Sequence, residues 1–528
     1  MTSQRRIIFI ICSFLVLQAF FYMIYRHQTK VQIIDEISAV CVKKSEEIKE
    51  PVVALPTPPV KKEQVNPVNY KFGFKSLVKE VSLDDLKVKG EIPNWLHGSL
   101  IFNGPAYLPN INENSGWFEG LAMLHLFNLD SNHVSYKNQF LKSKSFYDTF
   151  ATNNPKVKHI KINNANINVA KIANKFVALS EIPLPVIFNP KTLKTIGSFT
   201  YHDKLPSDKI FESSNPIRDE SKKETINFLI HMGALSSNYE IYKIKDDAFS
   251  LGLGDARREK IATITIKEPA YIHNLSITKN YIIFVEYPFV VKPYRLAMGG
   301  SMIDKFEWKP ERGTNFYVIN RNTKEVKTLN SKAFFAFSNV NAFEKNNKII
   351  VDIVTFEDAS IIKKMTTVMT RLNIKNYSPD IASKLSRFKL DLENKTVEEE
   401  TLSKESINFP RINENYIARP YNFVYGTSMR VRDYYDDINQ LSKININDKE
   451  EKYWDEDGCY PSEPVFVAAP NAQEEDDGVI MSVVLDGKKQ TSFLLILNAT
   501  SFKEIARVEL PHHIPFGLRG NFFPSPVV

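Results

Sequence analysis

Cysteine is scarce in this chain of 528 residues, which contains only Cys12, Cys41 and Cys459. Cys12 lies in an apolar N-terminal stretch, so the rest of the protein has material for at most one disulfide, and whether Cys41 and Cys459 form it is left open. No two cysteines have the close spacing of a metal-binding pair. The sequence therefore excludes zinc fingers and disulfide-stapled scaffolds.

A basic stripe interleaved with aromatic residues is also missing. The formal net charge is +7, which is small for this length, and the lysines are spread through the chain. Nucleic-acid-binding surfaces concentrate such charge, so we predict no nucleic-acid partner. With 43% hydrophobic and 24% charged residues, the composition is that of a globular protein with one large domain or two to three ordinary ones.

One apolar run stands out near the N-terminus. Residues 1–6 are short and basic, and Ile7–Tyr25 follows as 19 mostly apolar residues. At helical rise this run is roughly 28 Å long, about the thickness of the bilayer hydrocarbon. It lacks a small-residue cleavage pattern, so we predict an uncleaved signal anchor and a single-pass membrane location. Basic residues flank both ends, which leaves the side of the bilayer open.

The segment 26–68 is rich in proline and in charged residues and has few aromatics. Such a composition is typical of an extended tether rather than of packed structure. We therefore place the boundary of the folded body at residue 69, and the body extends to residue 528.

The body has the composition of an all-β protein. Aromatic residues make up 12% of the chain, and they favour strands as β-branched residues do. Short apolar segments alternate with Asn, Asp, Gly and Lys at intervals of roughly ten residues, as in sandwiches and propellers, and the spacing alone does not separate these two. We predict amphipathic helices only at Tyr294–Phe306 and Ala359–Asn373, as cover for the core.

His273 lies on a short apolar segment just before a predicted buried strand at residues 280–288. A single histidine in such a place is more often a core residue than a metal ligand. The residues around it change this balance. Several stretches resemble, in the same order, the carotenoid cleavage oxygenase family, and together they cover nearly everything after residue 70. They are Phe102–Ala106, Gly116–His125, Pro269–His273, Val340–Glu344 with Ile349–Asp352, Phe409–Asn413 with Pro420–Gly426, Tyr460–Phe466 with Glu474–Gly478, and Leu494–Asn498 through Pro515.

This resemblance implies a seven-bladed β-propeller whose loops and helices form a cap over an apolar tunnel. It also implies a ferrous iron on the propeller axis, held by four histidines with three glutamates around them. In this chain only His273 matches a ligand histidine, and the other three ligand positions are Asn215, Ser338 and Arg519. Two of the outer glutamates are present as Glu181 and Glu463, and Asn408 stands at the third position.

These replacements form a poor site for Fe(II), which prefers imidazole ligands. Arg519 is permanently charged, and its repulsion of a divalent cation at about 4 Å amounts to several kcal/mol. His202, His231, His512 and His513 do not fit the vacated positions. We therefore expect no cofactor, although the family uses Fe(II), and we expect Arg519 to pair with Glu181 or Glu463.

Three functions remain open from the sequence. The first is a pseudoenzyme that binds a carotenoid, retinoid or other isoprenoid in the tunnel. The second is an active dioxygenase that cleaves a carotenoid at an atypical metal site. The third is a scaffold that acts through a protein partner.

Overall fold

In the computed structural model, the described residues are 70–108, 117–151, 162–181, 183–207, 210–233, 236–247, 255–298, 303–362, 383–429, 439–517 and 519–524. The chain divides into two units, Met1–Ala54 and Leu55–Val528. All of the described residues belong to the second unit.

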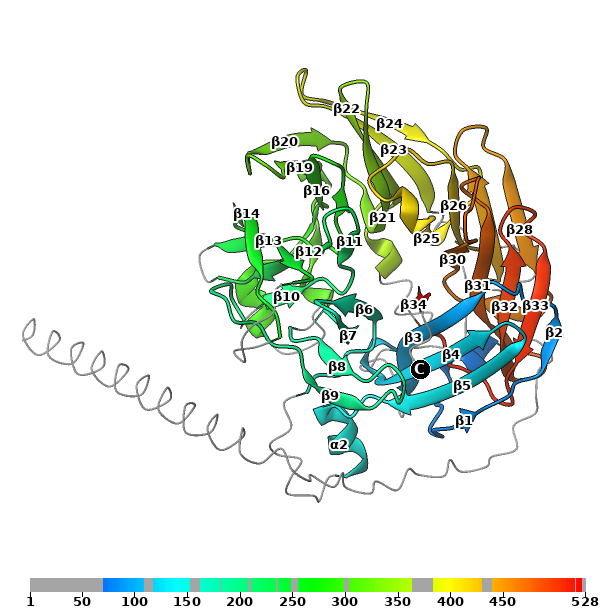
Figure 1. The fold of residues 1–528 in the computed structure, drawn as a ribbon. Coiled ribbons are helices and arrows are strands. Elements are labelled where there is room, and N and C mark those ends of the chain that lie inside the picture. Colours follow the sequence, from blue (N-terminus) through cyan, green and yellow to red (C-terminus); the bar gives the residue numbers. More distant parts are fainter. Residues whose placement is uncertain are drawn as a thin grey trace, which may run out of the picture. The chain divides into compact units, whose positions relative to one another are not determined.

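The second unit is a β-propeller, with seven sheets of four or more strands arranged around a centre (Figure 1). Six sheets follow one another along the chain. Blade 1 is β6 (Asn168–Ile172), β7 (Lys175–Leu179), β8 (Val186–Phe188) and β9 (Thr195–Ser198); blade 2 is β10 (Ile210–Glu212), β11 (Ile217–Asp219), β12 (Glu224–His231), β13 (Ser237–Lys245) and β14 (Glu259–Ile266); blade 3 is β15 (Ser276–Ile277), β16 (Tyr281–Glu286), β19 (Thr314–Asn320) and β20 (Val326–Ser331); blade 4 is β21 (Phe335–Lys345), β22 (Lys348–Phe356), β23 (Lys384–Asp391) and β24 (Thr396–Thr401); blade 5 is β25 (Asn408–Arg411), β26 (Phe423–Ser428), β27 (Gln440–Asn445) and β28 (Glu451–Asp455); blade 6 is β29 (Cys459–Pro461), β30 (Val465–Ala468), β31 (Gly478–Asp486), β32 (Thr491–Asn498) and β33 (Glu504–Glu509), joined by β2 (Val88–Gly90).

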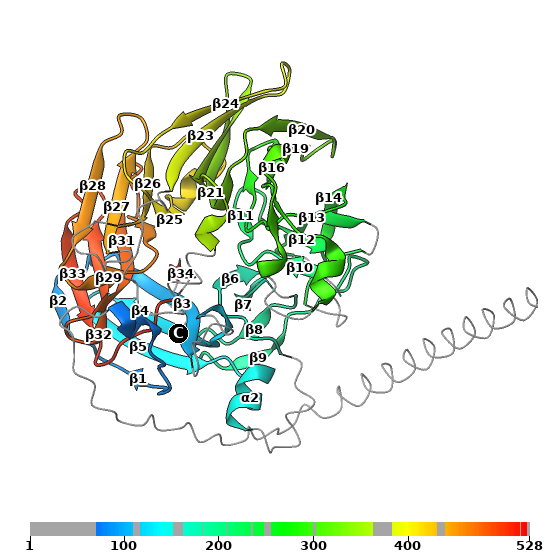
Figure 2. The same cartoon turned by 180° about the vertical axis from the view of Figure 1, so that it is seen from behind.

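Blade 7 combines strands from both ends of the propeller. β34 (Arg519–Phe523) pairs antiparallel with β3 (His97–Tyr107), and β4 (Leu121–Asp130), β5 (His133–Phe140) and β1 (Ser82–Leu83) complete the sheet. The blade also touches blade 1, because the Asn521 side-chain amide donates 2.6 Å to the Val169 carbonyl. This pairing joins the last strand of the propeller to its first blade-forming strands and so closes the ring. Figures 1 and 2 show β34 near the centre, beside the first strands of other blades.

Aromatic side chains fill the spaces between neighbouring blades. Phe316 of β19 packs against Phe388 of β23 with ring centroids 5.2 Å apart, which joins blades 3 and 4. Tyr425 of β26 stacks on Phe466 of β30 at 5.4 Å, which joins blades 5 and 6. Each such ring buries a large apolar area, so the high aromatic content is explained by these contacts.

The all-β prediction is confirmed, and helices are few and short. The described part contains α2 (Lys144–Phe150), whose first turn is capped by Ser143 Oγ accepting from the Phe146 N–H at 3.1 Å. The named 3-10 helices are η1 (Tyr70–Phe74), η2 (Trp117–Glu119), η4 (Pro293–Ala297), η5 (Ile303–Lys305), η6 (Pro310–Arg312) and η8 (Glu414–Tyr416). A separate two-stranded sheet pairs β17 (Phe289–Val290) with β18 (Glu307–Trp308).

The helix predicted at Tyr294–Phe306 is wrong. The described parts of that segment are η4 and η5, which are separate 3-10 turns. The sequence places Pro293 before the segment and Gly299-Gly300 inside it, and glycine pairs weaken a continuous helix. Most of the second predicted helix, Ala359–Asn373, lies outside the described residues.

The membrane location predicted from the sequence must be corrected. Within the part of the chain that the structure describes, no helix is long and apolar enough to cross a bilayer. The run on which the prediction depended, Ile7–Tyr25, lies outside the described residues, as does the predicted tether 26–68.

Candidate functional site at the propeller hub

The residues predicted at the iron positions gather into two groups near the centre of the propeller. We call His273, Asn215 and Glu181 the imidazole cluster; it comes from blades 1 to 3. We call Glu463, Arg519 and a third residue, Arg411, the guanidinium cluster; it comes from blades 5 to 7.

The imidazole cluster is held by hydrogen bonds between loops of different blades. Ser213, just after β10, donates 2.6 Å from its hydroxyl to the His273 carbonyl and accepts at 3.0 Å from the Asn215 N–H. Asn168 of β6 donates 2.9 Å to the Ser214 carbonyl. The bonds to the His273 carbonyl and to the Ser214 carbonyl join residues more than forty positions apart in the sequence, and together with the local bond they set His273 beside Asn215.

Both ring nitrogens of His273 are engaged by protein groups. Asn215 Nδ2 donates to Nδ1 at 2.8 Å, and Nε2 lies 3.3 Å from Glu181 Oε1. Because Nδ1 accepts a hydrogen bond, the ring proton of the neutral imidazole belongs on Nε2, facing the carboxyl group. Burial, with the charge of Arg519 as the second cause, lowers the pKa of His273 to about 3, so the ring is neutral near pH 7.

Glu181 is shared between the hub and a pocket. Burial raises its pKa to about 7, and the hydrogen bond from the Tyr271 hydroxyl, 3.0 Å long, opposes this rise. The carboxyl group is therefore close to half-protonated at neutral pH. Its contact with the neutral ring of His273 is a hydrogen-bonding contact rather than a full ion pair.

The guanidinium cluster has two cations around one carboxylate. The side chain of Glu463 has 0% of its area exposed, and its Oε2 accepts from Arg411 Nη2 at 3.0 Å. Its Oε1 lies 3.6 Å from Arg519 Nε, which is too long for a hydrogen bond. Arg411 Nη2 also donates 2.7 Å to the Gly520 carbonyl, which ties β25 to β34.

Burial lowers the pKa of Arg519, and the charge of Arg411 acts in the same direction, while Glu463 opposes both. A guanidinium starts from so high a pKa that it stays protonated at physiological pH. The expected pairing of Arg519 with one of the retained glutamates is therefore present with Glu463 at 3.6 Å, and Arg411 shares that carboxylate.

Ser338 and Asn408 remain apart from these contacts. Ser338 pairs with Val354 across β21 and β22 beside a register shift, and the neighbouring Asn339 N–H donates 3.0 Å to Asn274 Oδ1, next to His273. The Asn408 carbonyl accepts from the Thr427 hydroxyl at 3.3 Å. Among the described residues, neither the Ser338 nor the Asn408 side chain hydrogen-bonds to either cluster.

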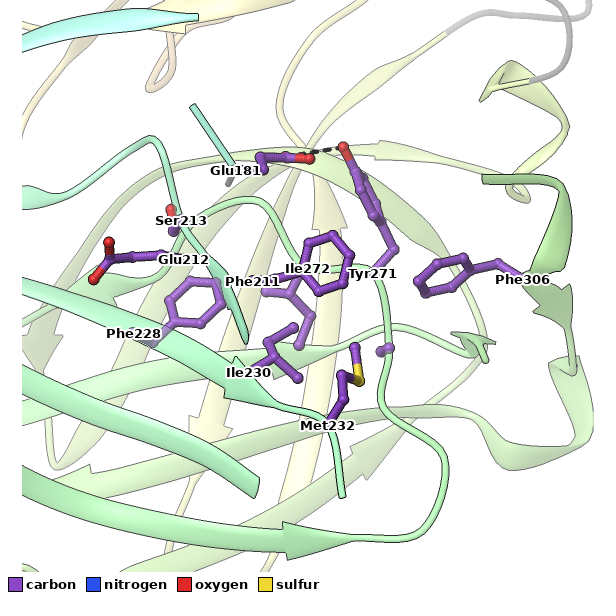
Figure 3. Close-up of a pocket in the computed structure, with 11 residues that line it drawn as sticks. Glu181, Phe211, Glu212, Ser213, Phe228, Ile230, Met232, Tyr271, Ile272 and Phe306 are labelled. Carbon is purple, nitrogen blue, oxygen red and sulfur yellow. Dashed lines mark hydrogen bonds between the residues drawn. The ribbon is translucent and has the colours of Figure 1, made fainter. Parts of the chain in front are cut away.

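An apolar pocket adjoins the imidazole cluster (Figure 3). The space outside protein atoms is about 360 Å³ when open solvent at its mouth is included, and its enclosed part is about 20 Å³. Figure 3 shows the rings of Phe211, Tyr271 and Phe306 together with Ile272 and Met232, and Glu181 at the side where Tyr271 donates to it. The remaining lining residues are Glu212, Ser213, Phe228, Ile230 and Ala270.

The side chains at the hub do not suit a ferrous ion. The four ligand positions offer one imidazole, one amide, one hydroxyl and one guanidinium. The two nitrogens of the imidazole already contact the Asn215 amide and the Glu181 carboxyl group. In the described ranges, no three His, Cys, Asp or Glu side chains are grouped so that they could hold a metal ion. His512 and His513 contact Tyr136 and the Lys75 carbonyl instead of the hub.

Two residues of this site were not predicted from the sequence. Arg411 lies in the stretch Phe409–Asn413, where a cation between apolar residues was a visible signal for a buried partner. Tyr271, two positions before His273, is the hydrogen-bond donor to Glu181. Its place next to the histidine was visible, but nothing local indicated a partner ninety positions away.

Comparisons of the sequence and of the structure with known proteins point to the same family of proteins. The family model for the retinal pigment epithelial membrane protein matches residues 74–524. The mitochondrial carotenoid-cleaving dioxygenase of Macaca fascicularis is 27% identical over 518 residues, which cover 83% of this chain and 91% of that protein. The beta,beta-carotene 15,15'-dioxygenase of Gallus gallus is 28% identical over 513 residues, covering 83% and 95%.

Solved structures match the same part of the chain. A chimera of ACO and RPE65 superposes with a TM-score of 0.75 at 25% identity and covers 88% of this chain and 100% of its own. A mutant of the apocarotenoid oxygenase from Synechocystis has a TM-score of 0.73 at 23% identity, covering 87% and 99%, and supports the fold.

Proposed function

Because this chain belongs to the retinal pigment epithelial membrane protein family, we propose that it binds an apolar isoprenoid, such as a carotenoid or retinoid, without cleaving it. The match over residues 74–524 establishes the family. Together with the carotenoid-cleaving relatives, it confirms the resemblance to carotenoid cleavage oxygenases that the sequence indicated. Fold alone does not carry function, so the proposal that this member does not cleave its ligand is argued from the groups at the hub.

The observation that supports binding without cleavage is the state of His273. Its Nδ1 accepts from Asn215 at 2.8 Å and its Nε2 faces Glu181 at 3.3 Å, so neither nitrogen is free to act as a metal ligand. Asn215 itself stands at one of the ligand positions. An iron ion would have to break these contacts and would then meet Arg519, whose charge repels it.

The pocket beside the hub supports an apolar ligand. Eight of its eleven lining residues are apolar or aromatic. Transfer of apolar surface out of water contributes about 25 cal/mol per Å², and this driving force needs no metal. An isoprenoid chain with a few polar groups suits such a lining better than a charged metabolite does.

Carotenoid cleavage is the second candidate, favoured by the names of the relatives, which are dioxygenases. It requires a metal site other than the one that the family positions offer here. The third function left open by the sequence is a scaffold that acts through a protein partner. It predicts that no ligand is extracted from the purified protein.

Two measurements on the full chain separate these functions. The purified protein is extracted with organic solvent and the extract is analysed for isoprenoids by absorbance and mass spectrometry. A second sample is loaded with Fe(II) without oxygen, desalted and analysed for metal. We expect a bound isoprenoid and no stoichiometric iron. Stoichiometric iron together with conversion of a polyene substrate would favour the dioxygenase, and an empty extract would favour the scaffold.

A gain-of-metal variant provides the matched control. Asn215→His, Ser338→His and Arg519→His together return imidazole to the three altered positions. We expect this triple variant to bind iron under the conditions in which the unaltered chain does not. Equal iron in both proteins would contradict the proposal that these three positions abolish the site.

A further inference from the structure

The guanidinium cluster carries more positive charge than its carboxylate balances. Arg411 and Arg519 flank Glu463, whose side chain has no exposed area. Arg411 Nη1 also lies 3.6 Å from Glu414, but that carboxylate is 69% exposed and solvent screens it. When this exposed carboxylate is left out, the two cations Arg411 and Arg519 face the single carboxylate of Glu463.

The hydrogen-bonding groups of the two guanidiniums are also incompletely used. A guanidinium has five N–H donors. Among the described residues, the guanidinium of Arg519 donates no hydrogen bond, and its Nε lies 3.6 Å from Glu463 Oε1. Arg411 Nε is buried without a partner in the same part of the chain. Even if Oε1 moved into hydrogen-bonding range of Arg519, four donors of that guanidinium would remain.

The imidazole cluster does not neutralise this surplus. The imidazole of His273 carries no negative charge in either protonation state. Glu181 is turned toward Tyr271 and the ring rather than toward the arginines, by its bonds of 3.0 Å and 3.3 Å.

The hub side chains are not fully covered by protein. His273, Arg411 and Arg519 keep 17%, 17% and 14% of their side-chain area exposed, and Glu181 keeps 21%. Glu181 also lines the apolar pocket, so one residue of the hub is shared with that lining.

We infer that the guanidinium cluster is an anion site, with Arg519 as its main donor, and that the isoprenoid bound by this protein ends in a carboxylate that reaches this site. This inference rests on the proposed function and adds the chemical class of the ligand. A carboxylate matches the planar fork of a guanidinium and gains from charge-assisted hydrogen bonds. The same site chemistry also suits a small free anion.

The test compares two probes with the same chain and different ends. Retinoic acid and retinol are titrated into the full chain, and their dissociation constants are measured by quenching of intrinsic fluorescence. We expect the acid to bind at least about tenfold more tightly than the alcohol, the effect of a hydrogen bond to a charged group. Arg519→Gln removes this preference and leaves the alcohol unchanged, whereas Arg519→Lys retains part of it.

The matched control is Arg218→Gln, which removes a similarly half-buried arginine paired with Asp246 on blade 2. It leaves the preference for the acid intact. Equal affinity for acid and alcohol in the unaltered chain overturns a carboxylate-bearing ligand, and a preference that persists in Arg519→Gln overturns the role of this arginine.

A second measurement tests the anion site without the apolar chain. Thermal unfolding is followed with and without acetate at constant ionic strength. If acetate stabilises the unaltered chain but not Arg519→Gln, the anion site is supported. If, in addition, the two retinoids bind equally, the occupant of the site is a free anion. Failure of both retinoids to bind sinks the proposed function, while the acetate result still decides the anion site. The absence of any acetate effect, together with equal binding, overturns the inference.

Discussion

The imidazole cluster and the guanidinium cluster occupy the same hub but are built on different physics. In the first, a neutral histidine, an amide and a carboxyl group with a raised pKa make short hydrogen bonds and carry little charge. In the second, two guanidiniums share a carboxylate that is fully buried. The comparison teaches that a replaced ligand position is accommodated by neighbours from adjoining blades. Asn215 hydrogen-bonds to His273, and Arg519 pairs with Glu463.

The largest effect is expected from Glu463→Gln, which leaves Arg411 and Arg519 buried without a counter-charge. Breaking a buried ion pair by removing one partner costs about 3–5 kcal/mol of unfolding free energy. Urea unfolding measures the loss. The matched control is Glu414→Gln, because that carboxylate is 69% exposed and its loss should change little. A similar, small effect for both variants would contradict the buried pairing.

The next effect concerns pH and separates two residues of the imidazole cluster, Glu181 and His273, by sign. The folded pKa of Glu181 is about 7 against an ordinary 4.5, so its contribution to stability is present below pH 4.5 and is lost as pH rises to about 7. The loss is on the order of 3 kcal/mol. The folded pKa of His273 is about 3 against 6.5, so its contribution is present above pH 6.5 and is lost as pH falls toward 3.

Between pH 4.5 and 6.5 these contributions oppose each other. Because the two slopes largely cancel in the unaltered chain, Glu181→Gln should produce a rise of stability with pH, and His273→Gln should produce a fall. Urea unfolding across this range measures both slopes, with the unaltered chain as reference. Parallel profiles for the two variants would show that the residues do not titrate as the structure indicates.

A smaller effect is expected from Asn215→Ala. The substitution leaves His273 Nδ1 without its donor, and an unsatisfied buried polar group costs about 1–3 kcal/mol. Nitrogen NMR of the His273 ring should also show loss of the single tautomer. Ser338→Ala is the control at another ligand position, since within the described part of the chain its hydroxyl makes no hydrogen bond. Equal costs for both would contradict the role of the Asn215 amide.

The smallest effect is expected from Arg519→Ala. The sequence indicated Arg519 as the partner of a retained glutamate, either Glu181 or Glu463. In the structure Glu463 keeps Arg411 at 3.0 Å, and removal of the second cation relieves repulsion between the arginines. We expect a change within about 1 kcal/mol, as for weakly coupled charges. Thermal unfolding of Arg519→Ala and of Glu463→Gln, measured side by side, gives both changes. Comparable losses of stability would show that Arg519 is the main partner of Glu463.

The sequence predicted the fold better than it predicted the contacts at the hub. The aromatic composition and the family stretches indicated an all-β propeller, because strand and turn preferences are local. The helix predicted at Tyr294–Phe306 was wrong because an apolar stripe does not reveal that the segment forms short 3-10 turns. The role of Arg411 was missed because its partners Glu463 and Gly520 lie 52 and 109 positions away.

What the sequence by itself determined was the identity of the groups at the hub: one imidazole, an amide, a hydroxyl and a permanent cation at the ligand positions. Chemical type does not depend on folding, so these statements hold without coordinates. Only the tertiary structure decided which group meets which, that both nitrogens of His273 are engaged, and that Glu463 serves two arginines. The physical reason is that pairing and pKa depend on burial and on distances between blades, which arise from the packing of segments remote in the chain.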